Sequence, residues 1–97
     1  MNKQEKIIML SFSPTITRLA GNEFGQEIFS NQVRDIMDLK CINVIVIPEN
    51  IQNVAISFVQ GFTNEIFKII NKGEFYTYFK IQGSEKVINK FNKSIYY

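Results

Sequence analysis

Ser57 has the clearest opportunity for chemistry, because it follows an apolar strand and opens a predicted helix. The run INVIVI, residues 42–47, predicts a strand buried on both faces, and apolar spacing predicts a helix over 57–70. A serine at a helix N-terminus suits phosphorylation or anion binding, since the helix dipole favours negative charge there. The spacing from Ser57 to Gln60 also matches a capping box, in which each side chain bonds the other's backbone amide. Both roles stay open, with capping favoured on the residues alone.

The residue types that most catalytic sites require are largely missing. The chain contains no histidine, and Cys41 is its only cysteine. Serine–histidine and cysteine–histidine nucleophile pairs, thiolate metal clusters and the usual zinc ligand sets are therefore excluded. Carboxylates remain, but those on the first predicted helix are interpreted as a solvated face. We predict no enzyme, no catalytic residue, no metal site and no cofactor.

Phe67 stands out on the second predicted helix because its neighbours on the helical wheel are polar. It lies beside Gln60 and Asn64, about 140° from Phe62 in the core-facing stripe. Either another helix covers Phe67, or this aromatic side chain anchors a partner, as aromatic residues often do at interfaces. The predicted partner-binding residues are Ser57, Gln60, Asn64 and Phe67.

A second candidate surface lies on the predicted third strand, residues 74–81. Tyr76, Tyr78 and Lys80 alternate with apolar residues, so they should share one face of that strand. Aromatic side chains with a lysine can stack single-stranded bases. Residues 66–97 also carry six lysines against two glutamates, but the net charge of the chain is only +2 and no RNP-type motif is present. Nucleic-acid binding is therefore a minority hypothesis.

The remaining elements follow from periodicity and from helix-capping residues. Apolar alternation predicts a first strand, helical spacing predicts a first helix capped by Asn22, and Ser84 should cap a last helix. The loop at 13–22 separates the first strand from that helix. The predicted strands are 6–12, 42–47 and 74–81; the predicted helices are 23–39, 57–70 and the segment after Ser84. Strands alternating with helices predict a small α/β sandwich, β-α-β-α-β-α, with a mainly parallel sheet.

Composition places the chain among compact intracellular proteins. Ninety-seven residues, 45% of them hydrophobic, suit one domain over 1–97. The apolar runs are far shorter than the roughly 20 residues that span a bilayer, and no signal peptide is recognisable. We therefore expect a cytoplasmic protein with no membrane association. Self-association as a homodimer is plausible for so apolar a small domain.

Three segments resemble the bacterial STAS-like domain family of unknown function, which is related in architecture to STAS anti-sigma-factor antagonists. The segments are FSPTITR, GNEFGQEIF and SFVQGFTNEIF, and the resemblance runs from about Phe12 to Ile70. The matched positions are Phe12, Ser13, Thr15, Arg18, Gly25, Glu27, Phe29, Ser57 and Phe58. The chain departs from the pattern at Ile47-Pro48, where the family tends to have aspartate, and at Gln60-Gly61, where it tends to have an acidic pair.

The resemblance implies a STAS-like fold and a protein-binding switch. In the related antagonists a serine at the start of the second helix can be phosphorylated by a partner kinase, and Ser57 occupies a similar position. A histidine-kinase-like ATPase is then an implied partner class. We therefore expect a non-enzymatic regulatory module that binds another protein.

Three alternative functions remain open at this stage. The chain fits a phage or mobile-element protein that inhibits a host defence complex stoichiometrically, in the manner of an anti-CRISPR protein. It also fits a weak nucleic-acid binder that uses Tyr76, Tyr78 and Lys80. An enzyme is the least favoured class, since no buried carboxylate can be singled out.

Overall fold

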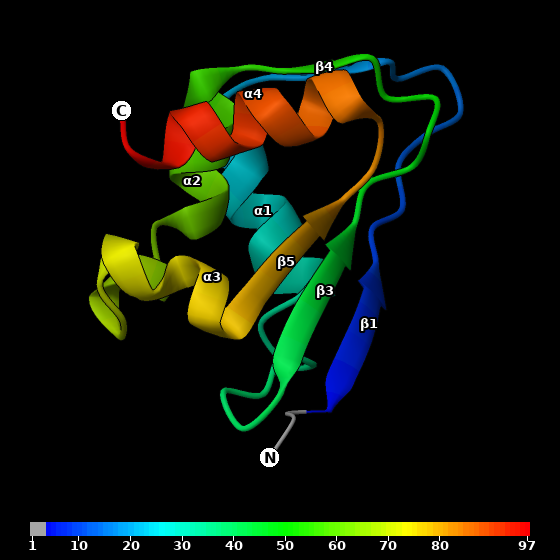
Figure 1. Ribbon diagram of the computed structural model, residues 1–97. Coiled ribbons are helices and arrows are strands. Elements are labelled where there is room, and N and C mark those ends of the chain that lie inside the picture. The colour runs from blue at the N-terminus through cyan, green and yellow to red at the C-terminus, as the bar shows by residue number, and fades with distance from the viewer. Residues whose placement is uncertain (1–3) are drawn as a thin grey trace.

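A three-stranded parallel sheet forms the centre of the molecule. The computed structural model describes residues 4–97. The sheet contains β1 (Glu5–Met9), β3 (Ile42–Val46) and β5 (Phe79–Gln82), in the order β1-β3-β5 (Figure 1). The register pairs Ile7 with Val44 and Val44 with Lys80. The predicted α/β class with a mainly parallel sheet is confirmed.

A second parallel sheet consists of two short strands. The residue pattern of these two segments did not predict a strand. β2 (Arg18–Leu19) pairs with β4 (Asn53–Val54). Leu19 and Val54 are both fully buried. This short pairing fixes the positions of the two segments that lead into the first two α-helices.

Within residues 4–97, four α-helices and two short 3₁₀-helices complete the fold. The bounds are α1 (Asn22–Gln32), α2 (Ile56–Thr63), η1 (Ile66–Lys68), η2 (Lys72–Glu74), α3 (Phe75–Tyr78) and α4 (Glu85–Ile95). Ser84 caps α4 as predicted, because its hydroxyl accepts a hydrogen bond from the Val87 amide at 3.3 Å. None of the helices within residues 4–97 combines the length and apolar character needed to cross a bilayer.

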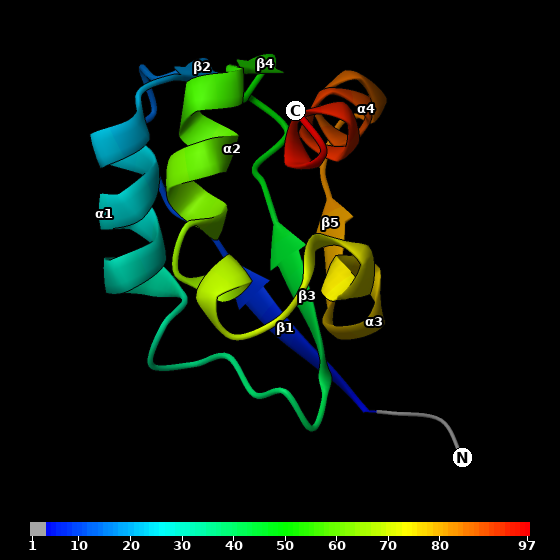
Figure 2. The same ribbon diagram turned by 90° about the vertical axis from the view of Figure 1, so that its left-hand side faces the viewer.

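The helices α1 and α2 lie on one face of the main sheet, whereas α3 and α4 lie beside and beyond β5 (Figure 2). The strand order advances in one direction, so crossovers of the same hand place α1 and α2 on the same side. Figure 2 shows these two helices side by side. In Figure 1 α1 passes behind the sheet, and no helix passes in front of β1 and β3. The covered face carries the buried row Ile8, Ile45 and Ile81.

Phe62 of α2 occupies the centre of the core that those helices enclose. Its ring lies 5.8 Å from Phe29 of α1, 6.0 Å from Phe58 and 6.0 Å from Phe91 of α4, measured between ring centroids. All four rings are almost fully buried. One phenylalanine therefore packs three helices together, and burial of aromatic rings contributes much of a core's stability.

Two glycines allow α1 and α2 to approach more closely than ordinary helices. A Cβ atom added to Gly25 would overlap the carbonyl oxygen of Phe58, and one added to Gly61 would overlap that of Asn22. The two helix backbones are therefore in direct contact at this crossing.

The first two helices are shorter than predicted. The first was expected over 23–39 but ends at Gln32, where the amides of Val33 and Arg34 both bond to the Phe29 carbonyl. Its N-cap is Gly21, at φ 102°, and not Asn22. The second was expected over 57–70 but ends at Thr63. The Thr63 hydroxyl bonds back to the Val59 carbonyl at 2.7 Å, a local interaction that does not favour continued helix.

The segment predicted as a third strand, 74–81, is half helix. Residues 75–78 form α3, and only 79–82 form β5. Phe75 and Phe79 are four residues apart, a spacing that fits one face of a helix as well as alternate positions of a strand. Their rings stack at 5.0 Å. Asn71 and Glu74 form a capping box just before this segment, which favours the helical start.

Candidate functional site

Gln60, Asn64 and Phe67, three of the four residues predicted to bind a partner, line one depression. This hollow of about 220 Å³ also receives Lys72 and residues from the end of α4, namely Ser94, Ile95 and Tyr97. Gln60 lies on α2 and Asn64 directly follows it, whereas Phe67 lies on η1 and not on the predicted long helix. These three residues are thus brought together across a helix break.

Phe67 is half-buried, so other elements cover part of its ring and part stays exposed. One side of its ring packs edge-on against Phe75, with 5.9 Å between the centroids. The ammonium group of Lys72 lies 6.0 Å from the centroid of the same ring, at the limit of a cation–π contact. The ring is therefore held by the core while part of it remains available to a partner.

The depression beside Phe67 continues along α4. A neighbouring hollow of about 250 Å³ shares Ser94 and Tyr97 with it and adds Ile56, Lys90 and Lys93. A third hollow, of about 730 Å³, shares Lys90 and Lys93 and extends to Asn53 of β4. Because neighbouring hollows share residues, we treat them as one continuous surface and call it the α2–α4 groove.

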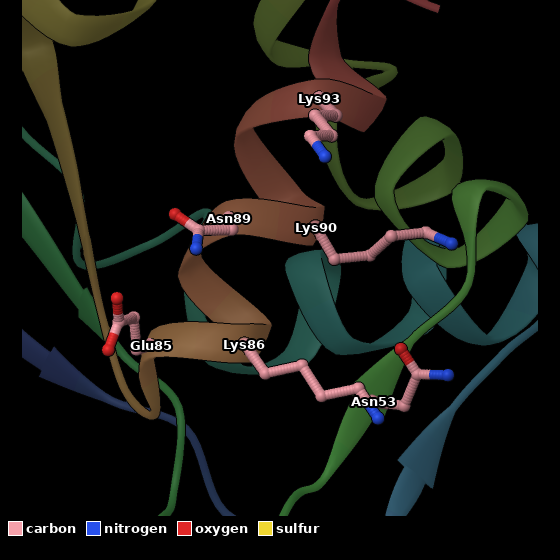
Figure 3. Close-up of a pocket in the computed structure, with 6 residues that line it drawn as sticks. All are labelled: Asn53, Glu85, Lys86, Asn89, Lys90 and Lys93. Carbon is pink, nitrogen blue, oxygen red and sulfur yellow. The ribbon is translucent and has the colours of Figure 1, made fainter.

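The groove is basic along its length. Figure 3 shows Lys86 and Lys90 extending from α4 in the same direction, with Lys86 directed toward Asn53. Lys93 lies one turn further along the helix, and Lys72 is at the opposite end of the groove beside Phe67. Glu85 is the acidic residue among those that line it. The groove therefore combines positive charge with an aromatic anchor and amide groups.

The lysines of α4 were not singled out from the sequence, although a signal was present. Lys86, Lys90 and Lys93 are spaced i, i+4 and i+7, which places them on one face of a helix. The opposite face buries Val87, Phe91 and Ile95. Half of the six lysines in residues 66–97 thus lie on one face of α4.

Ser57 is not among the residues that line the groove. α2 begins at Ile56 with Ala55 as its N-cap, and no side chain caps this end. The predicted capping box of Ser57 and Gln60 is therefore wrong. Instead the Ser57 hydroxyl accepts a hydrogen bond at 3.0 Å from the amide of Gly21, the N-cap of α1. Ser57 joins the starts of two helices, and its side chain is half-buried there.

The predicted nucleic-acid face is not formed. Tyr76 and Tyr78 lie on α3, and Lys80 lies on β5. The Tyr76 hydroxyl donates to Asn92 of α4, and burial, with a smaller contribution from Tyr96, raises the pKa of Tyr76 to about 12. Tyr78 is half-buried against the core, while Lys80 projects from the open face of the sheet. The prediction that these residues share one strand face is wrong.

Other contacts near the site are structural. Two nitrogens of the Arg34 guanidinium bond the Glu65 carboxylate at 2.7–3.1 Å, which fixes the residue that precedes η1. Both side chains are exposed, so the pair contributes about 1 kcal/mol or less. Within residues 4–97 no three Cys, Asp or Glu side chains gather closely enough to hold a metal ion.

Neither protein-family models nor curated proteins nor solved structures yielded a match to this chain.

Proposed function

We propose that this protein is a non-enzymatic regulatory module that binds another protein through the α2–α4 groove. The observation that carries this proposal is the convergence of Gln60, Asn64 and Phe67 in one hollow that continues along a row of lysines. An aromatic anchor beside directional polar groups is typical of a protein interface.

Each kind of residue has a distinct role in this binding. Phe67 supplies apolar contact, and its packing on Phe75 holds the ring in place before the partner arrives. Gln60 and Asn64 supply hydrogen bonds that fix orientation. Lys86, Lys90 and Lys93 attract acidic groups, which steers association and favours an acidic partner surface.

The resemblance to the STAS-like family supports a regulatory role. We propose a cytoplasmic setting and, as the implied partner class, a histidine-kinase-like ATPase. Phosphorylation of Ser57 would place a charged group where the hydroxyl now meets the Gly21 amide. The modification would separate the starts of α1 and α2, and α2 carries Gln60, so the groove would change with it.

A stoichiometric inhibitor of a host defence complex would use the same surface in the same way. That alternative differs only in the identity of the partner. A nucleic-acid ligand would instead depend on the lysines alone, and its affinity would fall steeply with salt.

The test is site-specific photo-crosslinking in the native cell. A photoreactive amino acid replaces Asn64, which lies in the groove, and in a second variant Asn31, which is exposed on α1. We expect one protein to be captured from position 64 and not from position 31, identified by mass spectrometry.

Matched variants then test the roles of the groove residues with the captured protein in purified form. Phe67→Ala should weaken binding at least about tenfold, whereas Ile69→Ala should not, because Ile69 is exposed in the same segment but lies outside the groove. Lys90→Glu should weaken binding more than Lys40→Glu. Equal capture from both crosslinking positions, or equal affinity for Phe67→Ala and wild type with folding intact, would contradict the proposal.

A further inference from the structure

The open face of the main sheet is unusual for a parallel sheet. Parallel sheets occur almost only with both faces covered, because their strands are apolar on both sides. Here α1 and α2 cover one face, and the other has no helix in front of β1 and β3 (Figure 1). Met9 is 73% exposed and Ile7 55% exposed on that uncovered side.

The strand register defines this open face. Paired residues point to the same side of a sheet, so the rows are Ile7–Val44–Lys80 and Met9–Val46–Gln82, preceded by Glu5–Ile42. Apolar side chains occupy the β1 and β3 positions of the two full rows; Ile7 and Met9 on β1 are exposed, whereas Val44 on β3 is only 2% exposed. Glu5 lies at one edge of the face and Lys80 at the other edge.

The charges at those two edges are complementary to each other. Glu5 and Lys80 are both exposed, and within residues 4–97 neither takes part in an ion pair. They are separated by the width of the sheet, so one molecule cannot join them. Two copies of the face can pair these charges, because Lys80 at the edge of one copy can meet Glu5 at the edge of the other.

We propose that two copies of this protein associate through the open faces of their sheets, with Glu5 of each copy paired with Lys80 of the other. A two-fold axis parallel to the strands turns the β1 edge of each copy toward the β5 side of its partner. The offset along the strand between Glu5 and the row of Lys80 is about 7 Å, which an extended lysine side chain spans. Ile7, Met9 and Val46 then meet at the centre, as in aligned sheet packing.

The alternative two-fold axis, perpendicular to the strands, is disfavoured by charge. It would place Lys80 of one copy against Lys80 of the other, and like charges opposite each other oppose association. The distribution of charge therefore selects one arrangement of the dimer.

The face is small, so the dimer should be weak and reversible. A sheet of three strands, five residues long at most, has a footprint well below the roughly 800 Å² per partner of a standard interface. This surface is separate from the α2–α4 groove, so the dimer leaves that groove accessible and does not depend on the proposed function.

The test is sedimentation equilibrium of the whole chain at concentrations from about 1 μM to about 1 mM, a range that covers weak association. Wild type should shift from monomer to dimer within it. Glu5→Lys and Lys80→Glu should each weaken dimerisation at least about tenfold, because each places like charges at both edges. Lys86→Glu, on α4, is the control and should dimerise like wild type.

Mixing the two charge variants gives the decisive result. Glu5→Lys and Lys80→Glu together should form a heterodimer, because every edge pair in the mixture then joins opposite charges. The doubly substituted chain should also regain self-association. A wild type that stays monomeric throughout the range overturns the proposal. So does dimerisation that neither variant weakens, or a mixture of the two folded variants that stays monomeric.

Discussion

Gly25 of α1 and Gly61 of α2 lie against each other where the two helix backbones touch. A Cβ atom on Gly25 would come within 3.1 Å of the Gly61 carbonyl carbon and would overlap the Phe58 carbonyl oxygen. The atoms in the way are backbone atoms, which cannot move aside as a flexible side chain would. The crossing therefore requires glycine at both positions.

Gly25→Ala and Gly61→Ala should each destabilise the fold by about 2 kcal/mol or more, since the added methyl group forces the helices apart. Gly73→Ala is the matched control, because a Cβ there meets nothing within 4 Å. Chemical denaturation of the three variants measures the free energy of unfolding. Similar values for Gly61→Ala and Gly73→Ala would show that the helices can separate at little cost.

Ser57→Ala should lower the free energy of unfolding by about 1 kcal/mol, because the Gly21 amide loses its acceptor. Ser57→Glu should cost more, since a larger charged group must enter a half-buried junction. Ser11→Ala is the control. The amide and carbonyl of Ser11 bond to Gln32, and substitution of its side chain leaves both bonds in place. If Ser57→Ala unfolds at the same denaturant concentration as wild type, the hydrogen bond between Ser57 and Gly21 does not stabilise the fold.

Asn43→Leu should destabilise the protein by about 2 kcal/mol, although it lies within an apolar strand. The buried Asn43 amide donates to the carbonyls of Asp38 and Tyr78, both at 3.0 Å, and its oxygen accepts from the Asp38 amide. Leucine would remove all three of these hydrogen bonds, although the Asp38 carbonyl would keep its bond from the Cys41 amide. Thermal unfolding should be compared between Asn43→Leu and Val46→Leu, which lies on the open face of the same strand. The comparison separates the loss of hydrogen bonds from the effect of introducing a leucine side chain. A variant as stable as wild type would contradict the assignment.

Titration of Tyr76 should make the free energy of unfolding fall as the pH rises above 10. Its pKa is raised from 10.0 to about 12 in the folded protein, so between these values the unfolded chain releases a proton that the folded chain retains. The contribution is fully present below pH 10 and is lost as the pH rises toward 12. Denaturation measured across this range should show a smaller decline for Tyr76→Phe than for wild type, whereas Tyr97→Phe should retain the full decline. Equal slopes for wild type and Tyr76→Phe would refute this role.

Much of the fold could be predicted because its strongest signals are local. The apolar run of β3 and the serine cap with the amphipathic face of α4 each specify an element without help from elsewhere in the chain. The segment at 74–81 could not be resolved in this way, because Phe75 and Phe79 satisfy both helical and strand periods. The break after Thr63 likewise gave no signal in the periodicity, because apolar residues continue at helical spacing through Ile66, Ile69 and Ile70.

The candidate site was predictable only in part for the same reason. A helical wheel groups Gln60 and Asn64, and placed Phe67 beside them on a helix that in fact ends earlier. The lysines of α4 share one face by spacing, but the position of Lys90 and Lys93 beside Ile56, at the start of α2, is tertiary. The position of Ser57 depends on a hydrogen bond to a residue 36 positions away, which no local pattern indicates.

The helix α4 buries Val87, Phe91 and Ile95 with one face and presents its lysines with the other. The groove therefore exists only while this last segment is docked on Phe62. Local opening of α4 would abolish the proposed binding surface while β1, β3, α1 and α2 stay together. Amide hydrogen exchange in α4 thus measures how often the groove is formed, and a partner bound there, as proposed, should slow that exchange.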